Sequence, residues 1–559
     1  MSSSKEEGAT KVKGNTPKTS YYDYIIIGAG AAGCVLANRL SENPENSVCL
    51  IEAGGSDKSP WIQIPAGIFG LYGNKKYDYA YKSMSQKHLN NRTITINRGK
   101  CLGGSTAINS MVYIRGSNED YDHWADLGCE GWSYEDVLPI FKDLENDQTG
   151  GDANFHGVEG ELSVVNPQDV NEASKRFVRA GAEAGLSENS DFNAGSQLGL
   201  GIYKVKQARG KRVSAYSAFI KPIKRRQNLR VLSNTKVLSI DIDRGVAKGV
   251  NIKIDTFDYK ITCREEVVLC AGAIDSPRLL LSSGIGNKQE LDELGIECKQ
   301  NLIGVGENLQ DHLDAMVTVR STVPESIGIS WRTLLNHVVP APFQYYLQKM
   351  GWWTTNYVEA GGFAQTKYAS GNAPDIQFHF TPIFRSHRGK KFEFGHGYSL
   401  FTCLLQPQSV GSVKLTREGS QLKLRIDHNF LASSQDELVM IEAIKKAREV
   451  FASAEFDSVR GNEMAPGGNV QSDEQILEYL RATTSTVFHP VGTCKMGNDD
   501  LAVVSPKDLK VKGMRNLRVI DASIMPSIIR GNTAAATMMI GEKGARMILA
   551  NQQSKQEET

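Results

Sequence analysis

The segment Asp23-Tyr24-Ile25-Ile26-Ile27-Gly28-Ala29-Gly30-Ala31-Ala32-Gly33 decides the fold of this chain. Its apolar run, residues 23–27, is typical of a strand that is buried on both faces. A helix is expected from Gly33 to Leu40, and a second buried strand over residues 47–51, ending at Glu52. A strand, a glycine-rich turn, a helix and a second strand make a βαβ unit.

The glycine pattern in this unit is that of a dinucleotide-binding loop. Gly28 allows a tight turn, Gly30 lets a pyrophosphate approach the backbone, and Gly33 permits close packing of helix on strand. Ala31 and Ala32 place the helix N-terminus toward the phosphates. Glu52 is expected to accept hydrogen bonds from ribose hydroxyls, which argues against a 2′-phosphate and hence against NADP. The pattern alone leaves NAD and FAD open.

Length and composition set further limits. The 559 residues exceed what one hydrophobic core supports, so two domains are expected. The net charge of +1 offers no general attraction for nucleic acid, and none is expected as a partner. Nine scattered cysteines indicate free thiols in a reducing compartment.

The chain ends and its hydropathy bear on location. Residues 1–20 are polar and predict a disordered tail without a signal sequence. No apolar run reaches the ~18 residues of a membrane span. We expect a cytoplasmic protein, with peripheral contact with the inner membrane left open.

Patterning along the chain predicts an α/β fold, α+β overall. Strands expected at 229–232, 237–241, 266–270 and 517–521 extend a parallel nucleotide-binding sheet, and a second, more antiparallel domain interrupts it. An aromatic, helix-like piece covers 331–350, and a closing helix 532–549. The expected boundaries are 21–165, 224–314 and 497–551 for a discontinuous nucleotide-binding domain, and 166–223 and 315–496 for a substrate-binding domain.

Two ungapped segments identify a resemblance. Residues 98–116 (RGKCLGGSTAINSMVYIRG) and 272–286 (GAIDSPRLLLSSGIG) resemble the two signatures of the glucose–methanol–choline (GMC) oxidoreductases, and the likeness runs from about Tyr22 to about Leu549. The resemblance implies FAD as cofactor. It implies flavin contacts from Arg98, Gly103, Gly104, Asn109 and Met111, an adenine contact from the Val237 backbone, and ribityl and phosphate contacts from Asp521 and Ala522. Some members attach FAD through a histidine; this chain has Ile108 there, so non-covalent FAD is expected.

The catalytic pair also follows from the resemblance. His489 lies in a segment, 488–497, that is similar to the family's C-terminal catalytic motif, and Asn532 occupies the partner position. A neutral imidazole can accept the hydroxyl proton of an alcohol. Asn532 would donate a hydrogen bond to the substrate oxygen. The hydride would pass to flavin N5.

Several alternatives accompany this interpretation. The chain resembles quinone-linked aliphatic alcohol dehydrogenases most, then choline dehydrogenases. An aromatic cage for choline could come from Trp352, Trp353, Tyr357 and Glu359, and an alkyl pocket from Phe378, Phe380 and Phe384. An O₂-using oxidase, a photodecarboxylase (Cys403 is out of register for it) and a hydroxynitrile lyase are remote alternatives. The oligomeric state is not predicted.

Overall fold

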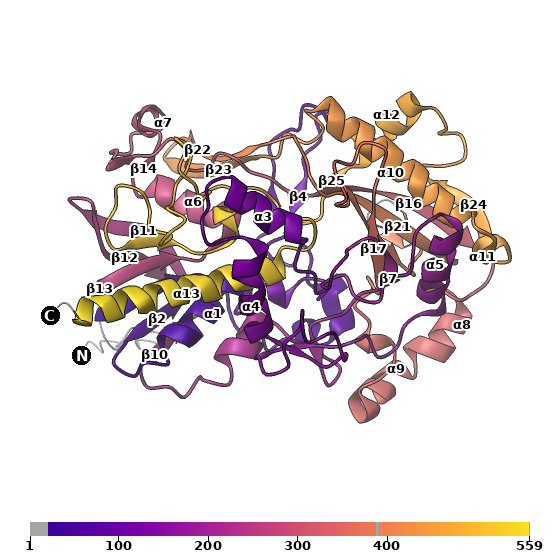
Figure 1. Ribbon diagram of the computed structural model, residues 1–559, viewed down its shortest axis with the longest axis horizontal. Helices are drawn as coiled ribbons and strands as arrows, with labels where there is room; N and C mark the ends of the chain where they lie inside the picture. Colours follow the sequence, from indigo (N-terminus) through magenta and orange to yellow (C-terminus); the bar gives the residue numbers. More distant parts are fainter. Residues whose placement is uncertain (1–20, 387–390, 393, 558–559) are drawn as a thin grey trace, which may run out of the picture.

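The computed structural model of the chain describes residues 21–386, 391–392 and 394–557. Two seven-stranded sheets dominate these residues, one toward each end of the long axis (Figure 1). The tail predicted for residues 1–20 lies outside the described residues.

The first sheet begins as the sequence predicts. β1 (Tyr21–Ile27) pairs in parallel with β2 (Val48–Ile51), and α1 (Ala31–Leu40) connects them. β10 (Leu229–Leu232) extends the sheet beyond β2, and β13 (Phe257–Leu269) lies on the other side of β1. Strands in this position are covered on both faces, which explains why Ile25, Ile26 and Ile27 are all apolar and buried.

The expectation of a parallel sheet is wrong for part of it. β11 (Thr235–Asp243), β12 (Val246–Ile254) and the first half of β13 form an antiparallel meander. Only Arg244 and Gly245, both at positive φ, separate β11 from β12. A two-residue turn of this kind can join only antiparallel strands. β26 (Leu517–Val519) then pairs in parallel with the last residues of β13. It is the strand that the sequence predicts over residues 517–521.

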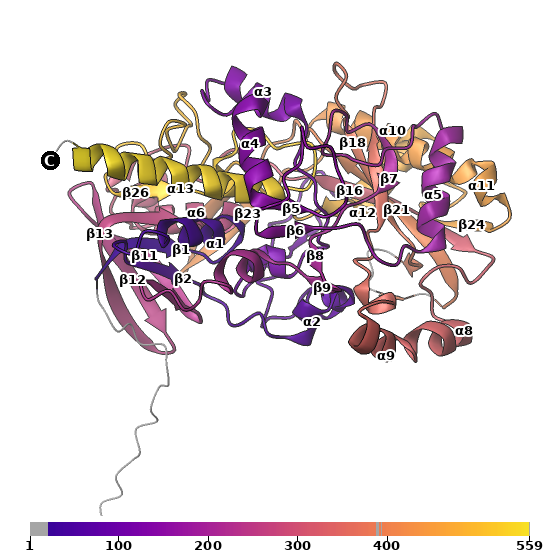
Figure 2. The ribbon, with the colours of Figure 1, turned by 60° about the horizontal axis from the view of Figure 1, so that its bottom comes forward.

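The second sheet is antiparallel throughout, in the order β24-β16-β21-β18-β17-β7, with β25 beside β16. α5 (Glu172–Glu183) and α10 (Ser434–Ala452) pack against one of its faces (Figures 1 and 2). Its strands are β7 (Gly199–Ile202), β16 (Leu313–Ser321), β17 (Ala360–Ala364), β18 (Ile376–Thr381), β21 (His396–Leu404), β24 (Arg460–Ala465) and β25 (Ser485–Thr486). The predicted domain boundary at 314/315 falls inside β16.

Shorter elements connect the sheets. The helices are α2 (Pro60–Gln63), η1 (Pro65–Gly70), η2 (Gly104–Ala107), α3 (Asn118–Asp126), α4 (Tyr134–Leu144), η3 (Tyr216–Ile220), α6 (Gly272–Ser282), α7 (Lys288–Glu293), α11 (Ala454–Asp457), α12 (Asp473–Thr483) and η8 (Ala522–Ile524). The predicted helical piece at 331–350 is broken at Pro340 into α8 (Trp331–Thr333) with η4 (Leu334–Val338) and α9 (Ala341–Phe343) with η5 (Gln344–Gln348); η6 (Trp352–Thr354) follows. Two-stranded pairs are β22–β23 (Ser412–Glu418, Gln421–Asp427), β3–β4 (Tyr81–Lys82, Thr95–Ile96), β5–β6 (Glu145–Asp147, Leu162–Val164), β8–β9 (Gln207–Ala208, Lys211–Arg212), β14–β15 (Ile285–Gly286, Gln300–Asn301) and β19–β20 (Arg385–Ser386, Lys391–Phe392).

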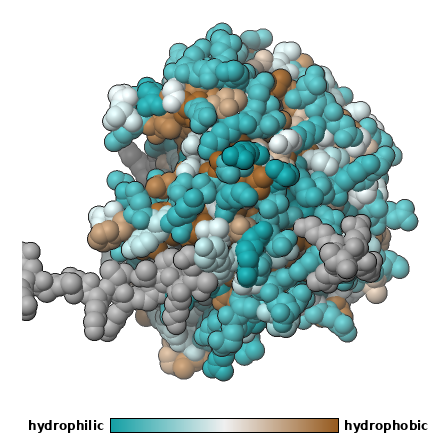
Figure 3. All heavy atoms as spheres, turned by 90° about the vertical axis from the view of Figure 1, so that its left-hand side faces the viewer, coloured by the Kyte–Doolittle hydropathy of each residue, from teal (hydrophilic) through white to brown (hydrophobic). Residues whose placement is uncertain are grey.

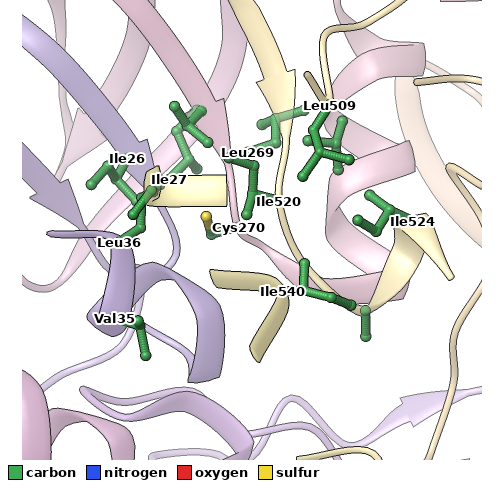
Figure 4. Close-up of a cluster of buried hydrophobic side chains, with 14 of the residues drawn as sticks. Ile26, Ile27, Val35, Leu36, Leu269, Cys270, Leu509, Ile520, Ile524 and Ile540 are labelled. Atoms are coloured by element: carbon green, nitrogen blue, oxygen red, sulfur yellow. The ribbon is translucent and has the colours of Figure 1, made fainter. Parts of the chain in front are cut away.

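The last helix closes the first domain. α13 (Ala534–Glu557) lies across α1, far from it in sequence (Figures 1 and 2). Figure 4 shows the core beneath, where Ile27 and Leu36 meet Leu269, Ile520 and Ile540. The chain therefore returns at its end to complete the core that its first strand begins.

The surface at the end formed by the first sheet is mostly hydrophilic, with scattered apolar side chains (Figure 3). No helix among the described residues is long and apolar enough to cross a membrane.

The contact between α1 and α13 allows a direct test. A Cβ on Gly541 would lie 2.8 Å from the Ala32 Cα, backbone against backbone. We expect Gly541→Val to lower the free energy of unfolding by about 1–3 kcal/mol in urea denaturation, because the helices must separate. Ala550→Val, on the exposed side of the same helix, is the matched control. Equal losses in the two variants would contradict this account.

Candidate active site

A cavity of about 790 Å³ lies between the two sheets. Its walls run from the glycine loop and Glu52, past the segment 97–112, to His489 and Asn532. On the side of the second sheet, the cavity wall is formed by residues of β16, β18 and β21 that face away from α5 and α10. One continuous space therefore joins the predicted nucleotide loop to the predicted catalytic pair.

The three loop glycines have three different surroundings. Gly28 has φ +106°, and a Cβ there would lie 2.4 Å from the Cys270 carbonyl oxygen. A Cβ on Gly33 would lie 2.0 Å from the Gly28 oxygen. A Cβ on Gly30, in contrast, would meet no protein atom within 4 Å and would enter the cavity. The loop is thus shaped so that a diphosphate can approach at Gly30, as the glycine pattern predicts.

Glu52 lies at the same end of the cavity. Its carboxylate accepts hydrogen bonds from the backbone N–H of Ala29 (3.1 Å) and Gly54 (2.8 Å). Burial raises the pKa of Glu52 to about 7, and these two donors oppose the shift. The carboxylate is fixed at the end of β2 with acceptor capacity left for ribose hydroxyls.

The first signature segment forms the middle of the cavity wall. Arg98, Gly104, Asn109 and Met111 line the cavity, and so does Ile108. The Asn109 side-chain oxygen accepts from the Met111 N–H (3.0 Å) and from the Arg212 guanidinium (3.1 Å). Met111 has φ +62°, which is uncommon for a residue with a side chain, so the surrounding contacts must hold its backbone in this conformation.

Two predicted cofactor residues do not line the cavity. Gly103 donates its N–H to the Ala29 carbonyl (2.8 Å), and Gly33 packs against Gly28. Both lie behind the wall: Gly103 joins the two glycine-rich segments, and Gly33 lets α1 pack closely against the turn at Gly28. Gly28, Ala31, Ala32, Val237, Asp521 and Ala522 do line it.

The Asp521 carboxylate connects two segments of the chain through hydrogen bonds that the sequence did not predict. Its carboxylate accepts from the Gly272 N–H (2.8 Å) and the Ser276 hydroxyl (2.5 Å). It also accepts from the N–H (2.8 Å) and hydroxyl (2.6 Å) of Ser523. The start of α6, in the second signature, is thereby tied to the 521–523 turn under the cavity.

His489 enters the cavity from a strained turn. The preceding residue, Phe488, has φ +69°, and its carbonyl accepts from Arg98 (2.8 Å). The His489 N–H donates to the Asp311 carboxylate (2.8 Å). These contacts fix the backbone at the position from which the imidazole points into the cavity.

A chain of hydrogen bonds sets the tautomer of His489. The Leu405 carbonyl can only accept, so His312 Nε2 must donate to it (3.1 Å). Neutral His312 then has an unprotonated Nδ1, which accepts from His489 Nδ1 (3.0 Å). His489 is left with a lone pair on Nε2, facing the amide nitrogen of Asn532 at 3.2 Å.

The electrostatic surroundings keep these imidazoles neutral. Burial lowers the pKa of His312 to about 4, and burial together with His312 lowers that of His379 to about 4. The pKa of His489 is well below its usual 6.5, first through burial and then through His312, His379 and Arg98. The His489 imidazole is therefore unprotonated at neutral pH and can act as a base.

The amide of Asn532 is also oriented. Its oxygen accepts from Gln377 Nε2 (3.3 Å), and the same Gln377 nitrogen donates to the Tyr203 hydroxyl (3.2 Å). Because the oxygen faces Gln377, the Asn532 NH₂ group faces His489. His312, His379 and Gln377 were not predicted as site residues. For Gln377 and His379 the available signal was their alternation with apolar residues on β18; His312 directly precedes β16.

The prediction that Phe378, Phe380 and Phe384 form an alkyl pocket is wrong. Phe378 and Phe380 face α5, where Phe380 stacks on Phe177 at 4.7 Å, and Phe384 lies against Arg320. Their neighbours His379 and Thr381 line the cavity instead, because alternate residues of a strand face opposite sides.

The predicted cation cage is not assembled either. The Glu359 carboxylate is buried and accepts from Thr355, Ser174 and the Asn171 N–H. Trp352 stacks on His337, and Trp353 packs against Tyr345. Of the four residues only Tyr357 lines the cavity.

Comparison with known proteins identifies the family. The N-terminal and C-terminal GMC oxidoreductase profiles match residues 22–314 and 407–541. The chain belongs to the GMC oxidoreductases. It is therefore an FAD-dependent enzyme that acts on alcohols, and the cradle at Gly30 and Glu52 fits that cofactor.

Similar proteins span nearly the whole chain. An alcohol dehydrogenase [acceptor] of Pseudomonas putida is 42% identical over 94% of this chain and 96% of its own length. An oxygen-dependent choline dehydrogenase of Rhizobium etli is 40% identical over 95% and 96%. Among solved structures, pyridoxine 4-oxidase from Mesorbium loti has TM-score 0.84 and 31% identity, covering 94% of this chain and 98% of its own. A formate oxidase variant of Aspergillus oryzae has TM-score 0.89 and 25% identity, covering 96% and 99%.

The open space at Gly30 separates cofactor binding from folding. Gly30→Val should weaken FAD binding by at least about tenfold, because the added side chain occupies the diphosphate approach. The stability of the apoprotein should stay close to that of the wild type, since an added Cβ meets no protein atom within 4 Å and the side chain extends into the cavity. Flavin fluorescence titration and thermal unfolding of the apoprotein measure the two effects. Unchanged FAD affinity would remove Gly30 from the cradle.

Proposed function

We propose that this enzyme oxidises primary aliphatic alcohols to aldehydes, with His489 as catalytic base and a quinone-type electron acceptor. The observation that carries the proposal is the hydrogen-bond chain from Leu405 through His312 to His489, which directs an unprotonated nitrogen at Asn532 within the cavity.

The two side chains divide the work on the substrate. His489 Nε2 accepts the hydroxyl proton of the alcohol, and His312 positions the ring and keeps its Nδ1 proton in place. The Asn532 NH₂ group donates to the substrate oxygen as negative charge develops there. Gln377 positions that amide. When bound, FAD supplies the oxidising chemistry by accepting the carbinol hydride at N5.

The walls on the substrate side support an alkyl substrate. Phe69, Tyr72, Phe401, Phe488 and Ile383 line this part of the cavity. The Tyr72 and Phe488 rings lie 5.7 Å apart, and those of Phe69 and Tyr357 lie 4.3 Å apart. Aromatic and aliphatic walls around a few polar groups suit an apolar chain that ends in a hydroxyl.

Choline is the second candidate, and a specific carboxylate favours it. Asp314 lies two residues after His312, is buried, and lines the same cavity. A carboxylate in a cavity that aromatic rings also line is the chemistry that recognises a quaternary ammonium. Asp314 is a better candidate for this role than Glu359, which lies outside the cavity.

The relatives' names differ in the acceptor. The alcohol dehydrogenase of Pseudomonas putida is named for an unspecified acceptor, and the Rhizobium etli choline dehydrogenase is named oxygen-dependent. Turnover with O₂ and with a quinone analogue therefore belongs in the same assay. The photodecarboxylase alternative gains no support, because Cys403 is fully buried with its thiol toward the Leu404 carbonyl at 3.7 Å.

The pH profile tests His489. Because its pKa lies well below 6.5, kcat/KM should stay flat from neutral pH to about 6.5 and fall only at lower pH, as the base becomes protonated. His489→Ala should retain FAD and lose on the order of 10²–10⁴-fold in turnover. Retained turnover at neutral pH would remove His489 from the role.

Asp314 separates the two substrate classes. In the wild type we expect medium-chain alcohols to be turned over more efficiently than choline, measured as kcat/KM with a quinone analogue. Asp314→Asn should leave the turnover of alkyl alcohols close to wild type and lower any choline turnover by about tenfold or more. The substitution keeps the size of the side chain and removes its negative charge, which only a cationic substrate needs. A choline preference above tenfold in the wild type would make choline the substrate.

A further inference from the structure

An apolar surface covers the outside of the segment 329–350. We call it the 329–350 surface; it consists of the exposed apolar side chains of Ile329–Met350 together with Phe394. Its most exposed members are Trp331 (76%), Phe394 (70%), Leu335 (66%), Leu347 (66%), Phe343 (65%) and Val339 (63%). So many large apolar side chains in contact with water mark an interaction site rather than chance exposure.

The spacing of these side chains shows that they form one row. Trp331, Leu335, Val339, Phe343 and Leu347 recur every four residues. Within each of the two helical stretches, 331–338 and 341–348, side chains four residues apart lie on the same face, and in both stretches that face is exposed. The inward side carries only Thr333, Ala341 and Tyr345 as buried residues. The apolar face of this helical pair therefore points outward, the reverse of an ordinary surface helix.

The charged residues within the segment 326–358 are all basic, and two acids lie beside it. The sequence has no Asp or Glu from Ser326 to Val358, while Arg332 and Lys349 lie near its two ends. The turn between β8 and β9 adds the exposed Arg209 and Lys211, because Gly210 between them packs against the Lys349 backbone. The neighbouring acids are engaged: Glu325 pairs with Arg176, and Asp169 accepts from the Gly351 N–H.

The position of the surface relates it to the cavity. Ile327 forms a β-bridge with Ile383, which lines the cavity. At the other end, η6 contacts η1, whose Phe69 lines the cavity, and the Tyr357 hydroxyl donates to the Ala66 carbonyl (3.1 Å). Figures 1 and 2 show α8 and α9 projecting from the edge of the molecule, far from the largely hydrophilic end in Figure 3.

We propose that the 329–350 surface docks the enzyme on an anionic lipid bilayer. A row of Trp, Phe, Leu and Val with basic residues at its ends is the chemistry of a helix that lies in the membrane interface. The aromatic rings suit the headgroup boundary, and the cations suit the phosphates. The absence of acids in this stretch of sequence gives charge complementarity to anionic lipid, whereas against a second copy of itself the same face would meet like charges. The proposal is independent of which alcohol the enzyme oxidises.

Co-sedimentation of the full-length holoenzyme with vesicles tests the proposal. Wild type should pellet with vesicles of phosphatidylglycerol and phosphatidylcholine, and far less with phosphatidylcholine alone. Leu335→Glu with Phe343→Glu should lower the apparent affinity by at least about tenfold, since two large side chains can no longer enter the interface. Arg332→Gln and Lys349→Gln should each lower it roughly fivefold on anionic vesicles only.

The control is an exposed apolar residue at the other end of the molecule. Phe257→Glu, on β13 with 61% of its surface exposed, should bind vesicles like wild type. Flavin absorbance and turnover with a soluble acceptor should be unchanged in all these variants, which verifies folding. Failure of wild type to bind anionic vesicles, or equal binding by the Leu335→Glu/Phe343→Glu variant, overturns the proposal. Self-association that this double variant abolishes, without vesicle binding by wild type, would assign the surface to a second copy instead.

Discussion

The structure depends on a junction where backbone meets backbone at the glycine loop. A Cβ on Gly28 would collide with the end of β13, one on Gly33 with Gly28 itself, and one on Gly104 would come within 2.8 Å of the Gly30 Cα. Such contacts exclude side chains from these positions, so the strand, the first helix and the signature segment can approach only where glycine stands. Gly30 is the one of the three loop glycines whose missing side chain leaves open space, and it lies in the cavity wall.

In the second sheet, apolar and polar side chains alternate along the strands, and the polar ones face the cavity. Residues of β16 and β18 that face α5 and α10 are apolar and buried, and their neighbours His379, Gln377 and Asp314 face the other way. Burial makes each of these polar groups costly unless it is paired. His312, which directly precedes β16, is paired with the Leu405 carbonyl and with His489, and the same pairing selects the tautomer of His489. Structural stability and catalytic readiness therefore rest on the same hydrogen bonds.

The arrangement also relates the site to its surroundings. The cavity wall includes residues of η1 and Ile383, and the segment from Ile327 to Tyr357, whose outer side is apolar, contacts both. An alcohol or an acceptor with a long hydrocarbon chain is concentrated in lipid rather than in water. A surface that holds this side of the cavity near a bilayer would shorten the path of such molecules to the catalytic pair.

The sequence by itself determined the βαβ unit, the glycine loop and the place of Glu52 at the end of the second strand, because short-range patterns encode them. It also predicted His489 and Asn532 as the catalytic pair, and the structure brings them within 3.2 Å of each other. It did not determine the antiparallel meander of β11–β13, the joint made by Asp521, or the places of Phe378, Phe380 and Glu359. The places of Phe378 and Phe380 depend on which face of β18 meets the cavity, and alternation of apolar and polar residues does not by itself say which face that is. The direction of β11 and β12 follows from the two-residue turn between them, and the joint at Asp521 needs a segment that is distant in the chain. Only the tertiary structure decided that His312 lies behind His489 and Gln377 behind Asn532, because these residues are far apart in the chain and meet only when the two sheets are brought together.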